Sequence, residues 1–207
     1  MRKRHSVMAA AAAVLLATGA CSVVDGIGGG DEPPQSMYTQ AEAFVAMEAV
    51  AADMVAVLPD FPGFERRLWL DHPCSHDGVE DPDYVSVEIE YTFAEADAAT
   101  PLVREEYVDL LKDHWVEQGY EVELDHAVEG DERTDRSLVV SSDENQLQIT
   151  YRVAHKVPIM ITSGCVPVSD PGELEYVPPL GGVEPGSKHD LVAEFFPEGI
   201  PAAEEQQ

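Results

Sequence analysis

Basic residues and long apolar runs are both scarce in this sequence. Only 12 Lys and Arg stand against 40 Asp and Glu in 207 residues, which gives a formal net charge of −28. A surface of that sign repels the phosphate backbone, so nucleic-acid binding is excluded for practical purposes. The apolar run at residues 7–17 has about half of the ~20 residues that a membrane-spanning helix needs. It is therefore too short to be a transmembrane segment.

Sequence motifs of catalysis are also lacking. The chain has no Gly-x-Ser-x-Gly elbow, no Ser-x-x-Lys, no phosphate-binding glycine loop after a strand and no His-Glu-x-x-His. An active site can still assemble from distant residues. On this evidence we expect a protein that is not an enzyme and that needs no cofactor.

The first 20 residues have the features of a secretory signal. Arg2, Lys3 and Arg4 precede the apolar run, and the small residues Thr18, Gly19 and Ala20 follow it. A basic start, a short apolar core and small residues before a cleavage point are typical of such signals. We expect residues 1–20 to be removed during export.

Cys21, directly after these small residues, gives the signal a more specific form. The segment Leu16–Ser22 resembles a bacterial lipoprotein signal, in which the cysteine thiol is acylated and becomes the new N-terminus. The resemblance departs at Thr18, where an aliphatic residue is usual. The alternative is an ordinary signal peptidase site at Thr18-Gly19-Ala20, which would free the protein into the surroundings. The lipoprotein form predicts a protein anchored by its lipid to the extracytoplasmic face of the cell membrane.

Removal of residues 1–20 makes the net charge of the protein more negative. Residues 1–20 hold three of the 12 basic residues and no acidic one, so residues 21–207 carry nine basic and 40 acidic residues, a net charge of −31. Such a domain is soluble, repels anionic headgroups and attracts cations or basic partners. Residues 21–37, with Gly28-Gly29-Gly30 and Pro33-Pro34, have the composition of a disordered tether that holds the domain away from the membrane.

Two cysteines remain once Cys21 is acylated. Cys74 and Cys165 allow a single pairing, and the oxidising environment outside the cytoplasm permits it. The bridge would close a loop of about 92 residues and stabilise the fold by roughly 4–5 kcal/mol in the chain-entropy model. We predict this disulfide.

A metal site is the alternative for the same cysteine. His72, Cys74 and His76 alternate, and imidazole and thiolate are ligands for zinc or copper. The site would need the thiolate that a disulfide removes, and Pro73 favours a loop in which the alternation is lost. We expect a loop through Asp83 and no metal at these residues.

The remaining pattern predicts two helices and several strands. Thr39 and Glu42 form a capping box before an apolar helical face that ends near Leu58, and Thr100 with Pro101 begins a second helix that Gly119 ends. Alternation predicts strands at residues 64–70, 84–93, 120–125, 137–141, 146–153 and 158–165. These elements indicate one α+β domain at residues 38–168, with two helices on a mostly antiparallel sheet.

Residues 169–207 are rich in Pro and Gly, and we expect an acidic tail of low order. Within it, the apolar group Leu191, Val192, Phe195 and Phe196 either docks on the domain or binds a partner, and docking is favoured.

Several charged or polar side chains could be functional, but each has a simpler structural interpretation. Arg66 and Arg67 point to opposite faces of a strand, so they cannot clamp one anion, and we expect them to pair with carboxylates. Glu88 and Glu90 lie on a solvated strand face. His114 lies near a helix end, where a cation is favoured by the dipole.

The order of signal, acidic linker, helix, strands, second helix and final meander closed by Cys74 and Cys165 resembles small LppA-like lipoproteins of high-GC Gram-positive bacteria. That resemblance covers roughly residues 1–168 and implies anchoring and location; the group offers no established chemistry to transfer. We expect a lipid-anchored binding or accessory module of the cell envelope, with an unidentified envelope protein or ligand as its partner. The alternative is a metal-handling envelope protein that uses His72, Cys74 and His76.

Overall fold

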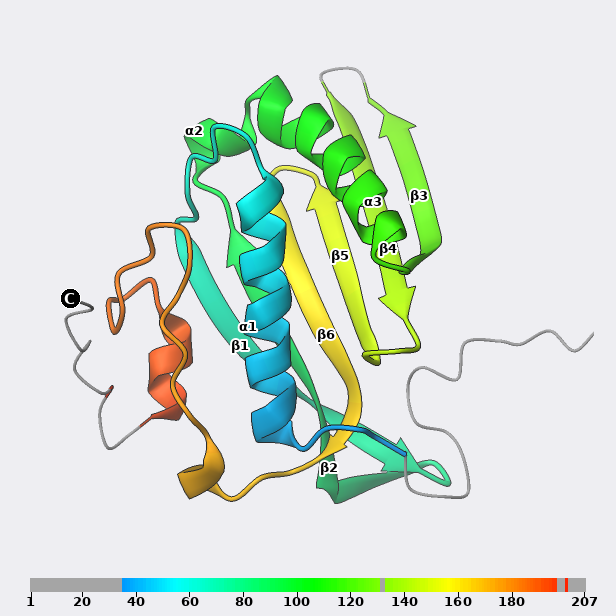
Figure 1. Cartoon of the computed structure of the whole chain (residues 1–207), viewed down its shortest axis with the longest axis vertical. Coiled ribbons are helices and arrows are strands. Elements are labelled where there is room, and N and C mark those ends of the chain that lie inside the picture. Colours follow the sequence, from blue (N-terminus) through cyan, green and yellow to red (C-terminus); the bar gives the residue numbers. More distant parts are fainter. Residues whose placement is uncertain (1–34, 131–132, 197–199, 201–207) are drawn as a thin grey trace, which may run out of the picture.

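The computed structural model describes residues 35–130, 133–196 and 200. The predicted signal, Cys21 and most of the predicted tether therefore lie outside the described residues. Within them, a six-stranded antiparallel sheet carries two main helices on one face (Figure 1). This confirms the α+β class and the antiparallel sheet. No helix in the described ranges has both the length and the apolar character needed to cross a membrane.

The sheet has the strand order β1-β2-β6-β5-β4-β3. Each pair of neighbours is antiparallel, and the only neighbours that are far apart in sequence are β2 and β6. The strands are β1 (Arg66–His76), β2 (Val79–Thr92), β3 (Glu121–Glu129), β4 (Thr134–Ser142), β5 (Leu147–Val153) and β6 (Pro158–Pro167).

Helix α1 (Gln40–Val57) packs over the middle of the sheet. The predicted capping box is present: Thr39 Oγ1 accepts from the Glu42 backbone N–H, and the Glu42 carboxylate accepts from the Thr39 N–H. The helix buries Phe44, Met47 and Met54 completely. These side chains face Val87, Ile89, Tyr91 and Ile161 of the sheet in one hydrophobic core.

The second main helix begins, as predicted, at Pro101, where the Thr100 hydroxyl accepts from the Val103 N–H. A π-helical turn (Leu102–Glu106) continues into α3 (Tyr107–Glu117), and a short helix α2 (Glu95–Ala98) precedes them. Gly119 ends the helix with φ of +91°, a conformation that glycine adopts without strain. Tyr107, Leu111 and Trp115 bury the face of α3 in the same hydrophobic core.

The predicted loop at residues 71–83 is wrong. β1 continues to His76 and β2 begins at Val79, so most of this segment is a long hairpin. Its turn is Asp77-Gly78, and both residues have positive φ, as a two-residue type I′ hairpin requires. Pro73 is tolerated because β1 is an edge strand and the register shifts between Pro73 and Cys74.

Strand β3 also differs from the expectation of one buried face. All nine of its residues are exposed, including Val122, Leu124 and Val128. The register shifts between Val122 and Leu124, so these two side chains no longer share a face. β3 is the outermost strand and pairs only with β4, which explains its exposure.

The predicted boundary at residue 168 does not end the packed part of the chain. Residues 169–196 are ordered and run back beside β1 and α1 (Figure 1). Val183 and Val192 are buried, and Phe195 stacks on Trp69 with ring centroids 5.0 Å apart. Of the two alternatives for the apolar group at residues 191–196, docking on the domain is the one that the structure shows. The low order predicted for this part of the tail is therefore wrong for residues 169–196, because their side chains complete the core.

Candidate functional site

Cys74 and Cys165 form the predicted disulfide, with an S–S distance of 2.04 Å. The bridge joins β1 to β6 across the intervening strand β2, and both cysteines are buried. Cys74 is therefore not a thiolate, and the metal-handling alternative loses one of its three ligands. The Nδ1 atom of His76 instead lies 2.6 Å from Asp81, and His72 is half exposed near Glu88. In the described part of the chain, no three His, Cys, Asp or Glu side chains are arranged to hold a metal ion.

The other polar residues singled out from the sequence have structural roles. Glu90 pairs with Arg66 at 3.0 Å on the open sheet face, and this confirms the predicted pairing of that arginine. His114 Nε2 lies 2.7 Å from Asp53 of α1, so it links the two main helices. A further polar residue, Ser163, also has a structural role: its hydroxyl accepts from the Val87 N–H where the register of β2 and β6 shifts.

Arg67 is the centre of a buried polar cluster, which we call the Arg67 network. Its guanidinium donates to Glu48 at 2.8 Å, to Asp190 at 2.9 Å and to the Val177 carbonyl at 2.7 Å. Its Nη2 lies 2.8 Å from the Asp190 carboxylate but forms no hydrogen bond. The network thus joins α1, β1 and the C-terminal segment through one side chain that is fully buried.

Two tyrosines complete the Arg67 network. Tyr91 Oη donates to Glu48 at 2.7 Å, and Tyr176 Oη donates to Asp190. Burial raises the pKa of the Glu48 carboxyl and of the Tyr91 phenol above their ordinary values. Perturbed groups of this kind often mark functional sites, but here none of them lines a described cavity. The network is therefore best explained as a structural contact that holds the C-terminal segment against β1 and α1.

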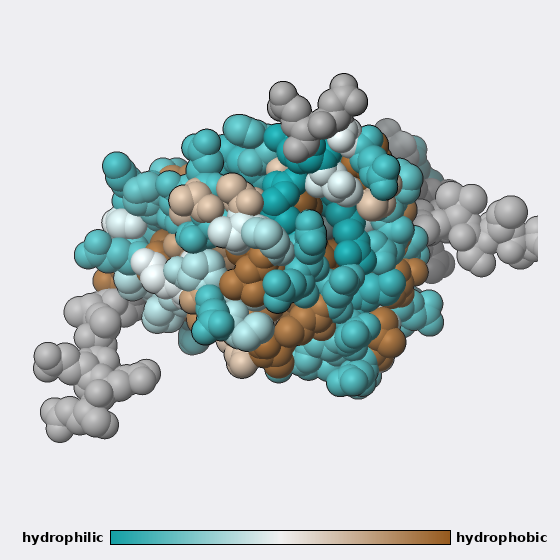
Figure 2. Space-filling model, turned by 90° about the horizontal axis from the view of Figure 1, so that it is seen from above, coloured by the Kyte–Doolittle hydropathy of each residue, from teal (hydrophilic) through white to brown (hydrophobic). Residues whose placement is uncertain are grey.

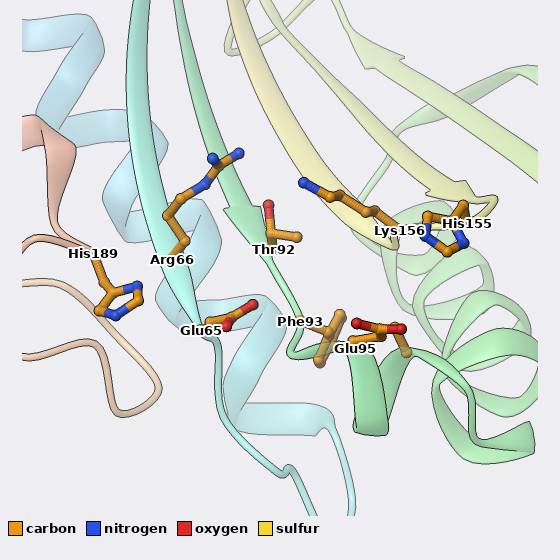
Figure 3. Close-up of a pocket in the computed structure, with 9 residues that line it drawn as sticks. Glu65, Arg66, Thr92, Phe93, Glu95, His155, Lys156 and His189 are labelled. Carbon is orange, nitrogen blue, oxygen red and sulfur yellow. The ribbon is translucent and has the colours of Figure 1, made fainter.

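A cavity of about 330 Å³ lies at the end of the sheet where β1 begins and β2 ends (Figure 3). It lies within the range of about 300–1,000 Å³ that is usual for small-molecule sites. Four segments that are distant in sequence form it, and its walls contain Glu65, Arg66, Thr92, Phe93, Glu95, Ala98, His155, Lys156 and His189. Seen from this end of the molecule, the surface is mostly hydrophilic with small apolar patches (Figure 2). We call this hollow the strand-end cavity.

Three charged side chains that have no partner among the described residues line the strand-end cavity. Six of the nine basic residues in 21–207 pair with carboxylates; Arg152, Lys156 and Lys188 have no side-chain partner in the described part of the chain. Lys156 lines the cavity. The carboxylates of Glu65 and Glu95 likewise have no described partner. Of the three basic side chains without a described partner, Lys156 is the one that lines a described cavity, together with two carboxylates from other segments, so we take this cavity as the better candidate for a binding site.

A second, more open cavity of about 580 Å³ lies between α1, the end of α3 and the turn after β4. Four of its polar side chains are bonded in pairs: Gln118 donates to Asp53 at 2.6 Å, and Asn145 donates to the Tyr120 hydroxyl at 2.6 Å. A ligand there would have to break these bonds. We therefore give the strand-end cavity precedence.

Sequence patterns did not identify the strand-end cavity. Its charged residues are spread from Glu65 to His189, and no motif connects them. A detectable signal was available for the opposite end of β1 and β2, since Asp77-Gly78 is a strong hairpin signature that would have extended both strands.

No family model and no curated protein matches the sequence. Among solved structures, one similar chain is LppA from Mycobacterium tuberculosis, described as a lipoprotein. The two chains are 14% identical, with a TM-score of 0.32; the match covers 67% of this chain and 83% of the other. So distant a similarity does not establish family membership or function.

Proposed function

We propose that this protein is a lipid-anchored module of the cell envelope that binds a small ligand in the strand-end cavity and catalyses no reaction. Anchoring rests on the sequence: a basic start, a short apolar run and small residues directly before Cys21. Binding rests on one observation: a cavity whose wall holds Lys156, Glu65 and Glu95, charges of both signs from three distant segments, with no partner among the described residues.

The position of the cavity supports this proposal. The described chain enters at one end of the sheet, where the Met37 N–H donates to Gln146 Oε1 at 2.9 Å. From there α1 runs to the opposite end of the sheet, and the chain reaches the cavity at Glu65 (Figure 1). Eighteen helical residues span about 27 Å at 1.5 Å per residue. An anchor at the entry end would thus leave the cavity on the far side of the domain, open to the surroundings.

The anchor is tested by membrane fractionation and by mass spectrometry of the mature protein. We expect the wild type to remain with membranes and its N-terminal peptide to begin with an acylated Cys21. Cys21→Ala removes the acylation site and should release the protein from membranes. The double variant Cys74→Ala, Cys165→Ala is the matched control, since it removes two cysteines but keeps the anchor.

Two results would contradict the anchoring. A Cys21→Ala protein that stays on membranes as firmly as the wild type would show that the lipid does not hold it. An unmodified Cys21 after cleavage at Ala20 would favour the freely secreted form.

A further inference from the structure

The charges of the strand-end cavity lie on two sides of the sheet end. Arg66 pairs in register with Thr92, so their side chains share the open face of the sheet. Glu65 precedes β1 in a bend, where its N–H donates to the Thr92 carbonyl at 2.9 Å. Figure 3 shows this separation: Arg66 and Lys156 extend together past Thr92, whereas the carboxylates of Glu65 and Glu95 lie on either side of Phe93.

The two sides differ in net charge. On the cationic side, Glu90 neutralises Arg66 at 3.0 Å and also accepts from the Thr92 hydroxyl at 2.8 Å, which leaves Lys156 as the uncompensated charge. On the anionic side, neither Glu65 nor Glu95 has a described partner. One ligand that satisfies both sides must carry an anionic group and a cationic group.

The charge of the whole molecule favours such a ligand over a simple ion. Residues 21–207 carry a net charge of −31, and the field of that charge opposes the approach of any anion. A cation would be attracted to many places on this surface and not to the cavity in particular. A zwitterion has no net charge, so the long-range field neither repels it nor disperses it, and the local charges decide where it binds.

We propose that the strand-end cavity binds a small zwitterion, a free amino acid or dipeptide. Its carboxylate would lie against Lys156 and Arg66, and its ammonium group against Glu65 and Glu95. A cavity of about 330 Å³ has the size for such a ligand. This ligand class rests on the proposed function of the cavity as a binding site.

The test uses the mature lipidated protein in detergent and a set of amino acids and dipeptides with free termini. Binding is measured by ligand-observed NMR and titration calorimetry. Each compound is compared with its N-acetyl derivative, an anion, and its C-terminal amide, a cation. We expect at least one zwitterion to bind with a Kd below about 1 mM. Both of its derivatives should bind at least about tenfold more weakly, which is one lost charge contact of about 1.4 kcal/mol.

Variants assign the two ends of the ligand. Lys156→Met should weaken binding of the zwitterion at least about tenfold and remove its advantage over the amide, since the carboxylate contact is lost. The double variant Glu65→Gln, Glu95→Gln should bind the zwitterion no more tightly than the N-acetyl derivative, since the contacts to the ammonium group are lost. Lys188→Met is the matched control: Lys188 is exposed, also lacks a side-chain partner and does not line the cavity, so affinity should not change.

The proposal is overturned if the N-acetyl or amide form binds as tightly as its parent, or if no zwitterion binds below about 1 mM. The first result would leave the cavity as a binding site for a simple anion or cation. The release of Cys21→Ala from membranes does not depend on these binding results. If the variant is released but the zwitterion test fails, the lipid anchor is retained and the proposed ligand class is rejected.

Discussion

Arg67 and Asp190 are 123 residues apart in the sequence, and their side chains meet in the interior with Nη2 and Oδ1 2.8 Å apart. Both side chains are fully buried. The pair fixes the C-terminal segment to β1, where the Arg67 N–H also donates to the His189 carbonyl at 2.9 Å. The ion pair thus also fixes the position of His189, which precedes Asp190 and lines the strand-end cavity.

Removal of Asp190 should destabilise the fold strongly. Asp190→Ala leaves Arg67 buried with Glu48 as its remaining carboxylate, and breaking a buried pair on one side costs about 3–5 kcal/mol. Urea unfolding measures the change. Arg66→Met is the matched control, because its pair with Glu90 is partly exposed and should contribute at most about 1 kcal/mol. Equal losses in the two variants would contradict a structural role specific to the Arg67 network.

Reduction of the disulfide should also lower stability. Cys74 and Cys165 are separated by 91 positions, and a loop of that length corresponds to about 4–5 kcal/mol in the chain-entropy model. We expect the double variant Cys74→Ala, Cys165→Ala to unfold at lower urea than the oxidised wild type. Added reductant should shift the wild type in the same direction and leave the variant unchanged. A free-thiol assay that finds both thiols free in the untreated wild type would refute the bridge.

The packing of the C-terminal segment predicts a contrast between two valines. Val192 is fully buried and Val168 is 48% exposed. Val192→Ala should cost about 1–3 kcal/mol, because it removes buried methyl groups and leaves a cavity. Val168→Ala should change stability by at most about 0.5 kcal/mol. Thermal or urea unfolding of the two variants decides whether residues beyond the predicted boundary at 168 contribute to the core.

Stability at low pH should depend on Asp125. Hydrogen bonds from Arg136, and then from Lys112, hold the pKa of this carboxyl far below its ordinary value of 3.8. A lowered pKa in the folded state means that the stabilisation is complete above the unfolded-state pKa and is lost as the pH falls below it. The wild type should have a larger free energy of unfolding than Asp125→Asn. This difference should be constant from about pH 5 to 7 and shrink below about pH 4.

Unfolding experiments from pH 2 to 7 measure this difference. Asp113→Asn is the control, since Asp113 is exposed on α3 and has no described basic partner. An advantage over Asp125→Asn that stays constant down to pH 2 would argue against the ion pairs that Asp125 forms.

Local signals predicted the elements whose causes lie within a few residues. The capping box at Thr39, the start at Pro101 and the glycine end at Gly119 each depend on backbone groups in one turn of helix. The strand at Tyr84–Phe93 was recognised because its alternation matches one buried and one solvated face. Local signals failed at residues 71–83, where Pro73 favours a loop but Asp77-Gly78 closes a hairpin.

By itself, the amino-acid sequence determined the two main helices, the alternating strands, the acidic surface, the single possible pairing of Cys74 with Cys165 and the fold class, since these follow from composition and short-range patterns. Only the tertiary structure decided that β2 lies beside β6, that Arg67 is buried while its neighbour Arg66 is partly exposed, and that residues 169–196 belong to the core. It also decided that charges from four distant segments meet in one cavity. The physical reason is that such contacts join segments that are up to 129 residues apart. Such contacts form only where the apolar surface buried by the whole chain offsets the loss of conformational entropy. A pattern of a few residues does not contain this information.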